Sequence, residues 1–123
     1  MLKLLLDEHI SPDVAAGVRR RLPAQKIWAL VEWEGGNLIG QDDEICMAEA
    51  ARQRLTLVTY DRRTIPPLLK RWAEAGRSHA GVVFVDEKTI APADVGGLVR
   101  AIIELARLSS RWDWTDHIVF LTR

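Results

Sequence analysis

The feature that most limits the fold of this chain is the alternation of short apolar runs with amphipathic segments. Five runs rich in Leu, Val and Ile lack the polar alternation of a half-exposed strand and are expected to be buried strands, at residues 2–6, 27–31, 55–59, 81–85 and 118–121. Segments with a helical period separate them. This order, with its short connections, predicts an α/β fold: a three-layer α/β/α sandwich around a mostly parallel five-stranded sheet.

Capping residues and apolar spacing place the helices between these strands. Ser11-Pro12-Asp13 is a typical helix start, and Pro23 is expected to end that helix. Gln41 or Asp42 is expected to cap a second helix that runs to about Arg54, with inward positions at Ile45, Ala48 and Ala51. Two further amphipathic helices are expected near 65–75 and 95–106. All 123 residues then form one domain, 1–123, because the chain is too short for a second core.

Composition excludes several classes of protein. No apolar run approaches the roughly 20 residues that cross a bilayer, and the first run is followed at once by Asp7 and Glu8, so we expect no membrane segment and no signal peptide. The single cysteine, Cys46, cannot form an internal disulfide, which favours a cytoplasmic protein. Seventeen basic and seventeen acidic residues cancel, so charge alone predicts no large nucleic-acid interface.

Carboxylates follow or precede the expected strands on one side of the sheet. Asp7-Glu8 follows the first strand, Asp61 follows the third, and Asp86-Glu87 follows the fourth, while Asp42-Asp43-Glu44 opens a helix on the same side. In an open parallel sheet, ligands bind outside the carboxyl ends of the strands. Converging carboxylates repel one another unless a hard cation such as Mg²⁺ or Mn²⁺ lies between them. The alternative is structural, because acids also favour helix starts and turns.

Three segments carry a resemblance to a known family: LLLDEHISPDVA, DDEICMAEAARQRLTLVTYDRRT and GVVFVDE. They resemble the PIN-like domains, and in particular a compact bacterial branch with relatives near toxin–antitoxin-like gene pairs. The most specific part runs from Asp43 to Asp61 and ends in Thr-x-Asp. The resemblance implies a PIN-like fold and an endoribonuclease that uses Mg²⁺ or Mn²⁺.

Carried over by position, the resemblance implies that Asp7, Asp43 and Asp61 are the catalytic residues and the metal ligands. Thr59 matches a group that orients a ligand, and Glu8 and Glu44 are supporting candidates. From their place beside Asp61, Arg62 and Arg63 are candidates to bind a phosphate, or else they form a solvated helix start.

The chain departs from the family pattern at two positions. Arg63 stands where classical members often have a further acid, and the glutamate expected between the first strand and Asp43 has no clear counterpart, with Glu34 and Glu44 as candidates by proximity. These departures motivate an alternative function, a PIN-like binding module without nuclease activity. A phosphoacceptor receiver domain is disfavoured because the last strand is followed by Thr122 and Arg123 and not by a lysine.

The expected partners follow from these hypotheses. A nuclease of this type would bind RNA, and a toxin of a toxin–antitoxin pair would also bind an antitoxin-like protein. The segment Trp112-Asp113-Trp114 is the candidate interaction patch, and a homodimer is one way to use it.

Overall fold

All five expected strands are present in the computed structural model, which describes residues 2–123. They are β1 (Lys3–Leu6), β2 (Lys26–Ala29), β3 (Thr56–Thr59), β4 (Val82–Val85) and β5 (Ile118–Leu121). The helices found between residues 2 and 123 are α1 (Pro12–Arg21), the 3-10 helix η1 (Leu30–Gly36), α2 (Asp43–Gln53), α3 (Ile65–Glu74) and α4 (Val95–Leu108). Within that range, no helix has both the length and the apolar character needed to cross a membrane.

The strands form one sheet in the order β2-β1-β3-β4-β5. Every neighbouring pair is parallel, so the described part of the sheet is all-parallel where a mostly parallel one was expected. The chain starts inside the sheet, moves outward to β2, and then returns past β1 to add the other three strands. This reversal creates a switch point between β1 and β3.

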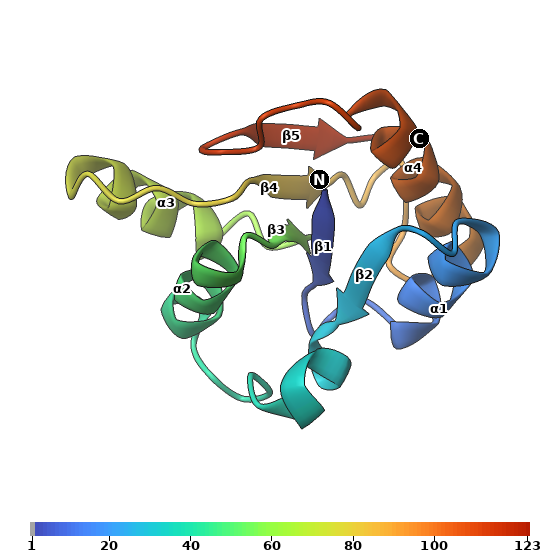
Figure 1. Cartoon of the computed structure of the whole chain (residues 1–123), viewed down its shortest axis with the longest axis horizontal. Helices are drawn as coiled ribbons and strands as arrows, with labels where there is room; N and C mark the ends of the chain where they lie inside the picture. Colours follow the sequence, from blue (N-terminus) through green and yellow to red (C-terminus); the bar gives the residue numbers. More distant parts are fainter. Residues whose placement is uncertain (1) are drawn as a thin grey trace.

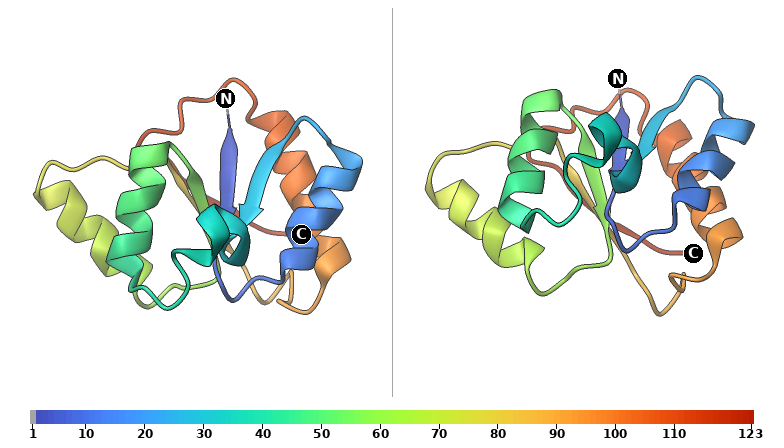
Figure 2. Two further views of the ribbon diagram at one scale, coloured as in Figure 1. Left: turned by 60° about the horizontal axis from the view of Figure 1, so that its bottom comes forward. Right: turned by 90° about the horizontal axis from the view of Figure 1, so that it is seen from below.

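Helices cover the sheet on both faces and give two apolar cores (Figures 1 and 2). On one face, α1 and α4 pack on the sheet through residues such as Val14, Val18 and Ile102. On the other, α2 and α3 pack through Met47, Leu68 and similar residues. Successive residues of a strand point to opposite faces, so β1 to β4 contribute to both cores, whereas β5 contributes only to the core of α1 and α4. The expected α/β/α layering is confirmed.

The last crossover of the sheet differs in hand from the first three. The connection from β1 to β2 moves in one direction along the sheet, and its helix α1 lies on one face. The connections from β2 to β3 and from β3 to β4 move in the other direction, and their helices α2 and α3 lie on the opposite face. These three share a hand. β4 to β5 continues in the same direction as β3 to β4, but α4 lies on the α1 face. Since about 98% of such crossovers are right-handed, the fourth is the exception.

Close packing between α1 and α4 accounts for this unusual position. A Cβ atom placed on Gly17 of α1 would lie 2.7 Å from Cγ2 of Val99 on α4, so only glycine permits the observed approach. Val99 is buried there. Because α4 is held against α1, no helix within residues 2–123 covers the α2/α3 face of β5, and Ile118 and Phe120 on that face are exposed.

The expected helix starts agree with the structure. The Ser11 side chain caps α1 by accepting a hydrogen bond from the Asp13 backbone N–H, with Pro12 as the first helical residue. Asp42, and not Gln41, caps α2 by accepting from the N–H of Ile45. Asp94 caps α4 by accepting from the N–H of Gly97.

Two local expectations are wrong. The second strand ends at Ala29 and not at Val31, because the carboxylate of Glu32 accepts hydrogen bonds from the Ala29 N–H and from Arg19 and turns the chain into η1. In α2, Ile45 is 45% exposed and not inward. The buried residues are Cys46, Met47 and Ala50, so the helix is rotated relative to the face expected from the sequence.

Candidate functional site

The candidate site lies at the switch point, where β1 and β3 end side by side. Asp7 follows β1 directly, and its backbone N–H donates to the Val58 carbonyl, extending the β1–β3 pairing by one residue. Asp61 lies two residues beyond the end of β3. Ligands of doubly wound α/β sheets bind outside the carboxyl ends of the strands at such a point. Topology therefore brings the two carboxylates to the expected end of the sheet.

Thr59 connects these two acids. Its side chain is buried, and its hydroxyl donates to Oδ2 of Asp7 at 2.6 Å while accepting the Asp61 backbone N–H at 2.9 Å. A hydroxyl has one proton to donate, so this pair of bonds fixes its orientation. Thr59 thus fixes the position of Oδ2 of Asp7 relative to the backbone at Asp61. The other oxygen of Asp7, Oδ1, is left for another partner.

Asp61 is fixed by the chain that follows it. Oδ1 of Asp61 accepts the backbone N–H groups of Arg63 and Thr64 at 2.8 and 2.9 Å, at the start of α3. Burial works against the charged form, but these N–H donors hold the pKa of Asp61 below its usual range. Asp61 is therefore ionised at neutral pH, with Oδ2 outside this turn.

Asp43 reaches the site because of the rotation of α2. It is the first residue of the helix and lies three, four and seven positions before Cys46, Met47 and Ala50, so it shares their buried face. Burial raises the pKa of Asp43, and the negative charges of Asp61 and Asp7, with smaller contributions from Asp42 and Glu8, raise it further. Carboxylates from two other segments, and from the cap of its own helix, thus act on the Asp43 side chain.

A small cavity lies among Asp7, Glu8 and Asp43, whereas Asp61 lines a different cleft. The volume of this cavity is about 10 Å³, and Asp7, Glu8 and Asp43 line it together with Gln41 and Cys46. That is close to the space of a single water-sized sphere. Burial and the nearby charges of Asp43, Asp7 and Glu8 raise the pKa of the Cys46 thiol to about 11, so Cys46 is a neutral wall of the cavity at pH 7.

The carboxylates interact electrostatically but do not form a closed ligand cage. Between residues 2 and 123, no three His, Cys, Asp or Glu side chains are grouped closely enough to hold a metal ion together. Mg²⁺ commonly binds through one or two carboxylates and keeps several waters. Asp7, Asp43 and Asp61 carry the hard, negatively charged oxygens that such a cation prefers. In this structure, however, the three side chains are not grouped closely enough to hold one ion together.

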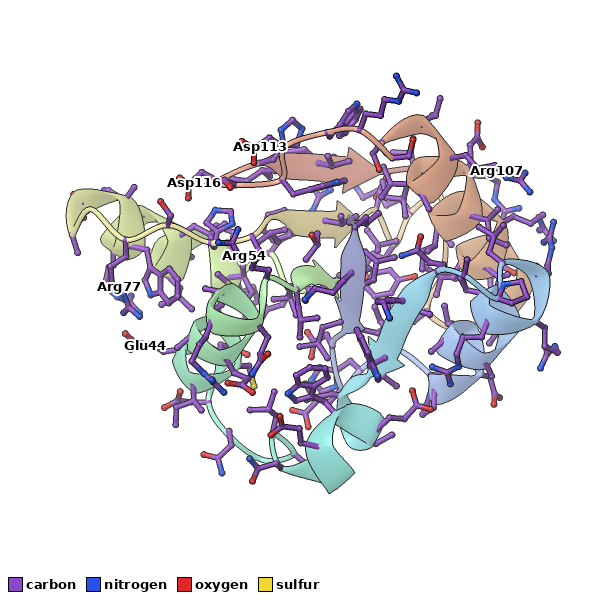
Figure 3. The ribbon with its side chains drawn as sticks, viewed as in Figure 1. Glu44, Arg54, Arg77, Arg107, Asp113 and Asp116 are labelled. Atoms are coloured by element: carbon purple, nitrogen blue, oxygen red, sulfur yellow. The ribbon has the colours of Figure 1, made fainter. Side chains whose placement is uncertain are left out.

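The other predicted site residues occupy different surroundings. Glu8 lines the cavity, whereas Glu44 points toward Arg77, beyond the end of α3, with 3.7 Å between the charged atoms (Figure 3). Arg62 and Arg63 are exposed and line a second cleft of about 330 Å³ together with Asp61. Asp86, Glu87 and Lys88, which follow β4, complete that cleft.

The acids of the β2–α2 connection do not supply the missing glutamate. Glu32 forms a salt bridge with Arg19 at 2.7 Å, and this bond lowers the pKa of Glu32 against the opposing effect of burial. Glu34 is exposed and has a left-handed backbone with φ of 45° inside η1. Neither lines the cavity that holds Asp7 and Asp43.

The tryptophan segment is not one exposed patch. Trp112 is 44% exposed, but Trp114 is buried and packs against Gly81, where a Cβ atom would lie 2.7 Å from the indole ring. His117 packs against both rings. The expectation that Trp112, Asp113 and Trp114 share one surface is therefore wrong for Trp114, which belongs to the core.

Sequence reasoning missed two contributors to the site. From the sequence, Cys46 is considered only as a residue without a disulfide partner, yet it lines the acidic cavity. Phe120 was interpreted only as part of the last strand, yet its ring is exposed beside Arg62. The first depends on the rotation of α2 and the second on the position of α4, and no local sequence pattern indicates either. Comparison of the chain with family models, with curated proteins and with solved structures gives no match.

Proposed function

We propose that this chain is a Mg²⁺- or Mn²⁺-dependent endoribonuclease of the PIN-like type, with Asp7, Asp43 and Asp61 as metal ligands. One observation carries the proposal: Asp7, Glu8 and Asp43 line one small cavity at the switch point, where burial and the charges of Asp61 and Asp7 raise the pKa of Asp43. Segments far apart in the sequence thus concentrate negative charge at the switch point. A fold does not maintain such repulsion for stability, and a bound divalent cation would remove it.

In this proposal each residue has a separate task. Asp7, Asp43 and Asp61 would hold the ion, and Thr59 would keep Asp7 oriented through its 2.6 Å hydrogen bond. Glu8 would add charge at the cavity wall. When bound, a divalent ion polarises a phosphodiester and lowers the pKa of a coordinated water. Arg62 and Arg63 would bind a phosphate of the RNA in the cleft that also contains Asp61.

A binding module without catalysis is the second candidate. It is favoured by the absence, within residues 2–123, of three acidic, histidine or cysteine side chains close enough to share a metal. Arg63 at the position of a classical acid also supports it. In that case the acidic crevice, formed by Asp7, Glu8, Asp43 and Asp61, would be an inherited feature without a catalytic role. An RNA or an antitoxin-like protein would bind without being cleaved.

Mn²⁺ titration by calorimetry separates the two candidates. The wild type should bind Mn²⁺ saturably, and Asp61→Asn should lose this binding because the variant removes a charged ligand. Glu104→Gln is the matched control, since it removes one negative charge from an exposed position on α4. Wild-type protein that shows no binding at millimolar Mn²⁺ would contradict the nuclease and favour the binding module.

A further inference from the structure

An open groove lies on the face of β5 that α4 leaves uncovered. Its volume is about 690 Å³, and it is lined by Phe84, Ile118 and Phe120 of the sheet and by Arg62, Leu69 and Lys70. We call it the aromatic groove. Ile118 is 44% exposed and Phe120 is 61% exposed, whereas Phe84 is buried. An apolar surface that a helix would normally cover is thus open to solvent.

The aromatic groove combines aromatic rings with positive charge. Phe84 and Phe120 are stacked with their centroids 5.6 Å apart, and the Arg62 guanidinium lies 5.2 Å from the centroid of the Phe120 ring. Lys70 adds a second cation from α3. No Asp or Glu is among its lining residues in the described part of the chain. The groove therefore suits a ligand that is both flat and anionic.

Arg62 links the aromatic groove to the candidate metal site. It lines the groove, and it also lines the cleft that contains Asp61, Arg63 and Lys88. A chain-like ligand that occupies the groove would therefore continue past Arg62 toward Asp61. This continuity argues for the same polymer at both places.

We propose that the aromatic groove is a nucleotide subsite, in which a base of the RNA stacks on Phe120 and the adjoining phosphates bind Arg62 and Lys70. The proposal rests on the proposed function, because it assigns the RNA a path next to the cleaved bond. Base–aromatic stacking together with cations along the backbone is how proteins hold single strands. The stacked base must be unpaired, since a paired base does not offer its face.

Charge argues against a second copy of this chain in the aromatic groove. A twofold interface places the same patch against itself, so Arg62 and Lys70 of each copy would face like charges. An acidic protein segment would satisfy the cations, but it would not explain the continuity with Asp61.

The test measures binding of a short fluorescent uridine oligonucleotide by anisotropy, in EDTA so that no cleavage occurs. Phe120→Leu, which keeps an apolar side chain but removes the ring, should weaken binding by about tenfold. Phe120→Tyr should restore it. Lys70→Ala should lower the slope of log Kd against log salt by about 0.7, as expected for one lost phosphate contact. Arg107→Ala, an exposed arginine on α4, is the matched control and should leave the slope unchanged (Figure 3).

The outcomes distinguish this subsite from the proposed function. Wild-type affinity in Phe120→Leu would overturn the subsite even if Asp7-dependent cleavage is observed with Mn²⁺. Weaker binding in Phe120→Leu, with no cleavage in any divalent metal, would uphold the subsite and contradict the nuclease. A third result is a wild type that fails to bind the oligonucleotide and instead binds a polyglutamate peptide whose affinity falls in Lys70→Ala. That result would assign the groove to an acidic protein partner and overturn the proposal.

Discussion

The acidic crevice formed by Asp7, Glu8, Asp43 and Asp61 and the aromatic groove on β5 belong to one sheet but have opposite chemistry. In the crevice, Asp7, Glu8 and Asp43 line a cavity of about 10 Å³, and the charge of Asp61 acts on Asp43, whereas the groove of about 690 Å³ is apolar with two cations. The crevice follows from the ordinary reversal of strand order at β1 and β3. The groove follows from an exception, the position of α4 on the α1 face.

The side chains of the two regions contribute differently to the stability of the folded protein. In the crevice, the charge of Asp43 opposes stability, because burial and the charges of Asp61 and Asp7 disfavour it. In the groove, exposure leaves Phe120 with little to contribute to the core while its neighbour Phe84 is almost completely buried. Mutations should therefore separate stability from binding in the groove and couple them in the crevice.

The largest expected effect compares the two phenylalanines of the groove. Phe84→Ala should reduce the free energy of unfolding by about 3–5 kcal/mol, because it removes a buried ring and leaves a cavity. Phe120→Ala should cost less than about 1 kcal/mol, because its ring is 61% exposed. Urea unfolding of both variants checks this. Equal losses would show that Phe120 is a structural residue and would weaken the contrast between the regions.

The next effect concerns the chemistry of the crevice. Under the proposed nuclease function, Asp7→Asn should reduce Mn²⁺-dependent RNA cleavage by about 100-fold, because it removes the charge of a proposed ligand that Thr59 orients. Thr59→Val, which keeps the shape but loses the hydroxyl, should cost about 10-fold or more. Single-turnover cleavage rates measure both. A Thr59→Val enzyme with the wild-type rate would show that the hydrogen bond serves only the fold.

A smaller effect tests how Asp61 is held. Asp61→Ala should destabilise the protein by about 1 kcal/mol at pH 7, because the N–H groups of Arg63 and Thr64 lose their acceptor. Asp61→Asn keeps an acceptor oxygen and should lose less. The folded state lowers the pKa of Asp61, so its charge stabilises the protein above the ordinary pKa of 3.8, and that stability is lost as the pH falls through the lowered value. Thermal unfolding across this pH range should therefore show Asp61→Asn converging with the wild type in acid, whereas Asp61→Ala should keep the loss that comes from the missing acceptor.

The sequence was sufficient for features that depend on neighbouring residues. The alternation of strands and helices, the cap at Ser11 and the positions of Asp7 and Asp61 after their strands all follow from local patterns. Features set by distant contacts could not be predicted. The rotation of α2, which brings Asp43 to the crevice, depends on the core beneath Met47. The open face of β5 depends on the approach of α4 to Gly17, some eighty residues away in the chain.

The smallest expected effect reverses the usual sign for removing a charge from a helix start. Asp43→Asn should stabilise the metal-free protein at pH 7, because it removes a charge that burial and the charges of Asp61 and Asp7 disfavour. The gain should stay below about 1 kcal/mol, since the favourable interaction of Asp43 with the helix dipole is lost at the same time. Asp42→Asn is the matched control, because Asp42 is the exposed cap of the same helix.

The pH dependence of this gain identifies its cause. The folded state raises the pKa of Asp43, so the wild type loses stability as the pH rises through that raised value. Below the ordinary pKa of 3.8 the side chain is protonated in both the folded and the unfolded states, and Asp43→Asn should match the wild type there. Saturating Mn²⁺ should reverse the order at pH 7, since only the wild type has the full set of charged ligands. A variant that is less stable at every pH would show that Asp43 serves the helix and not a metal.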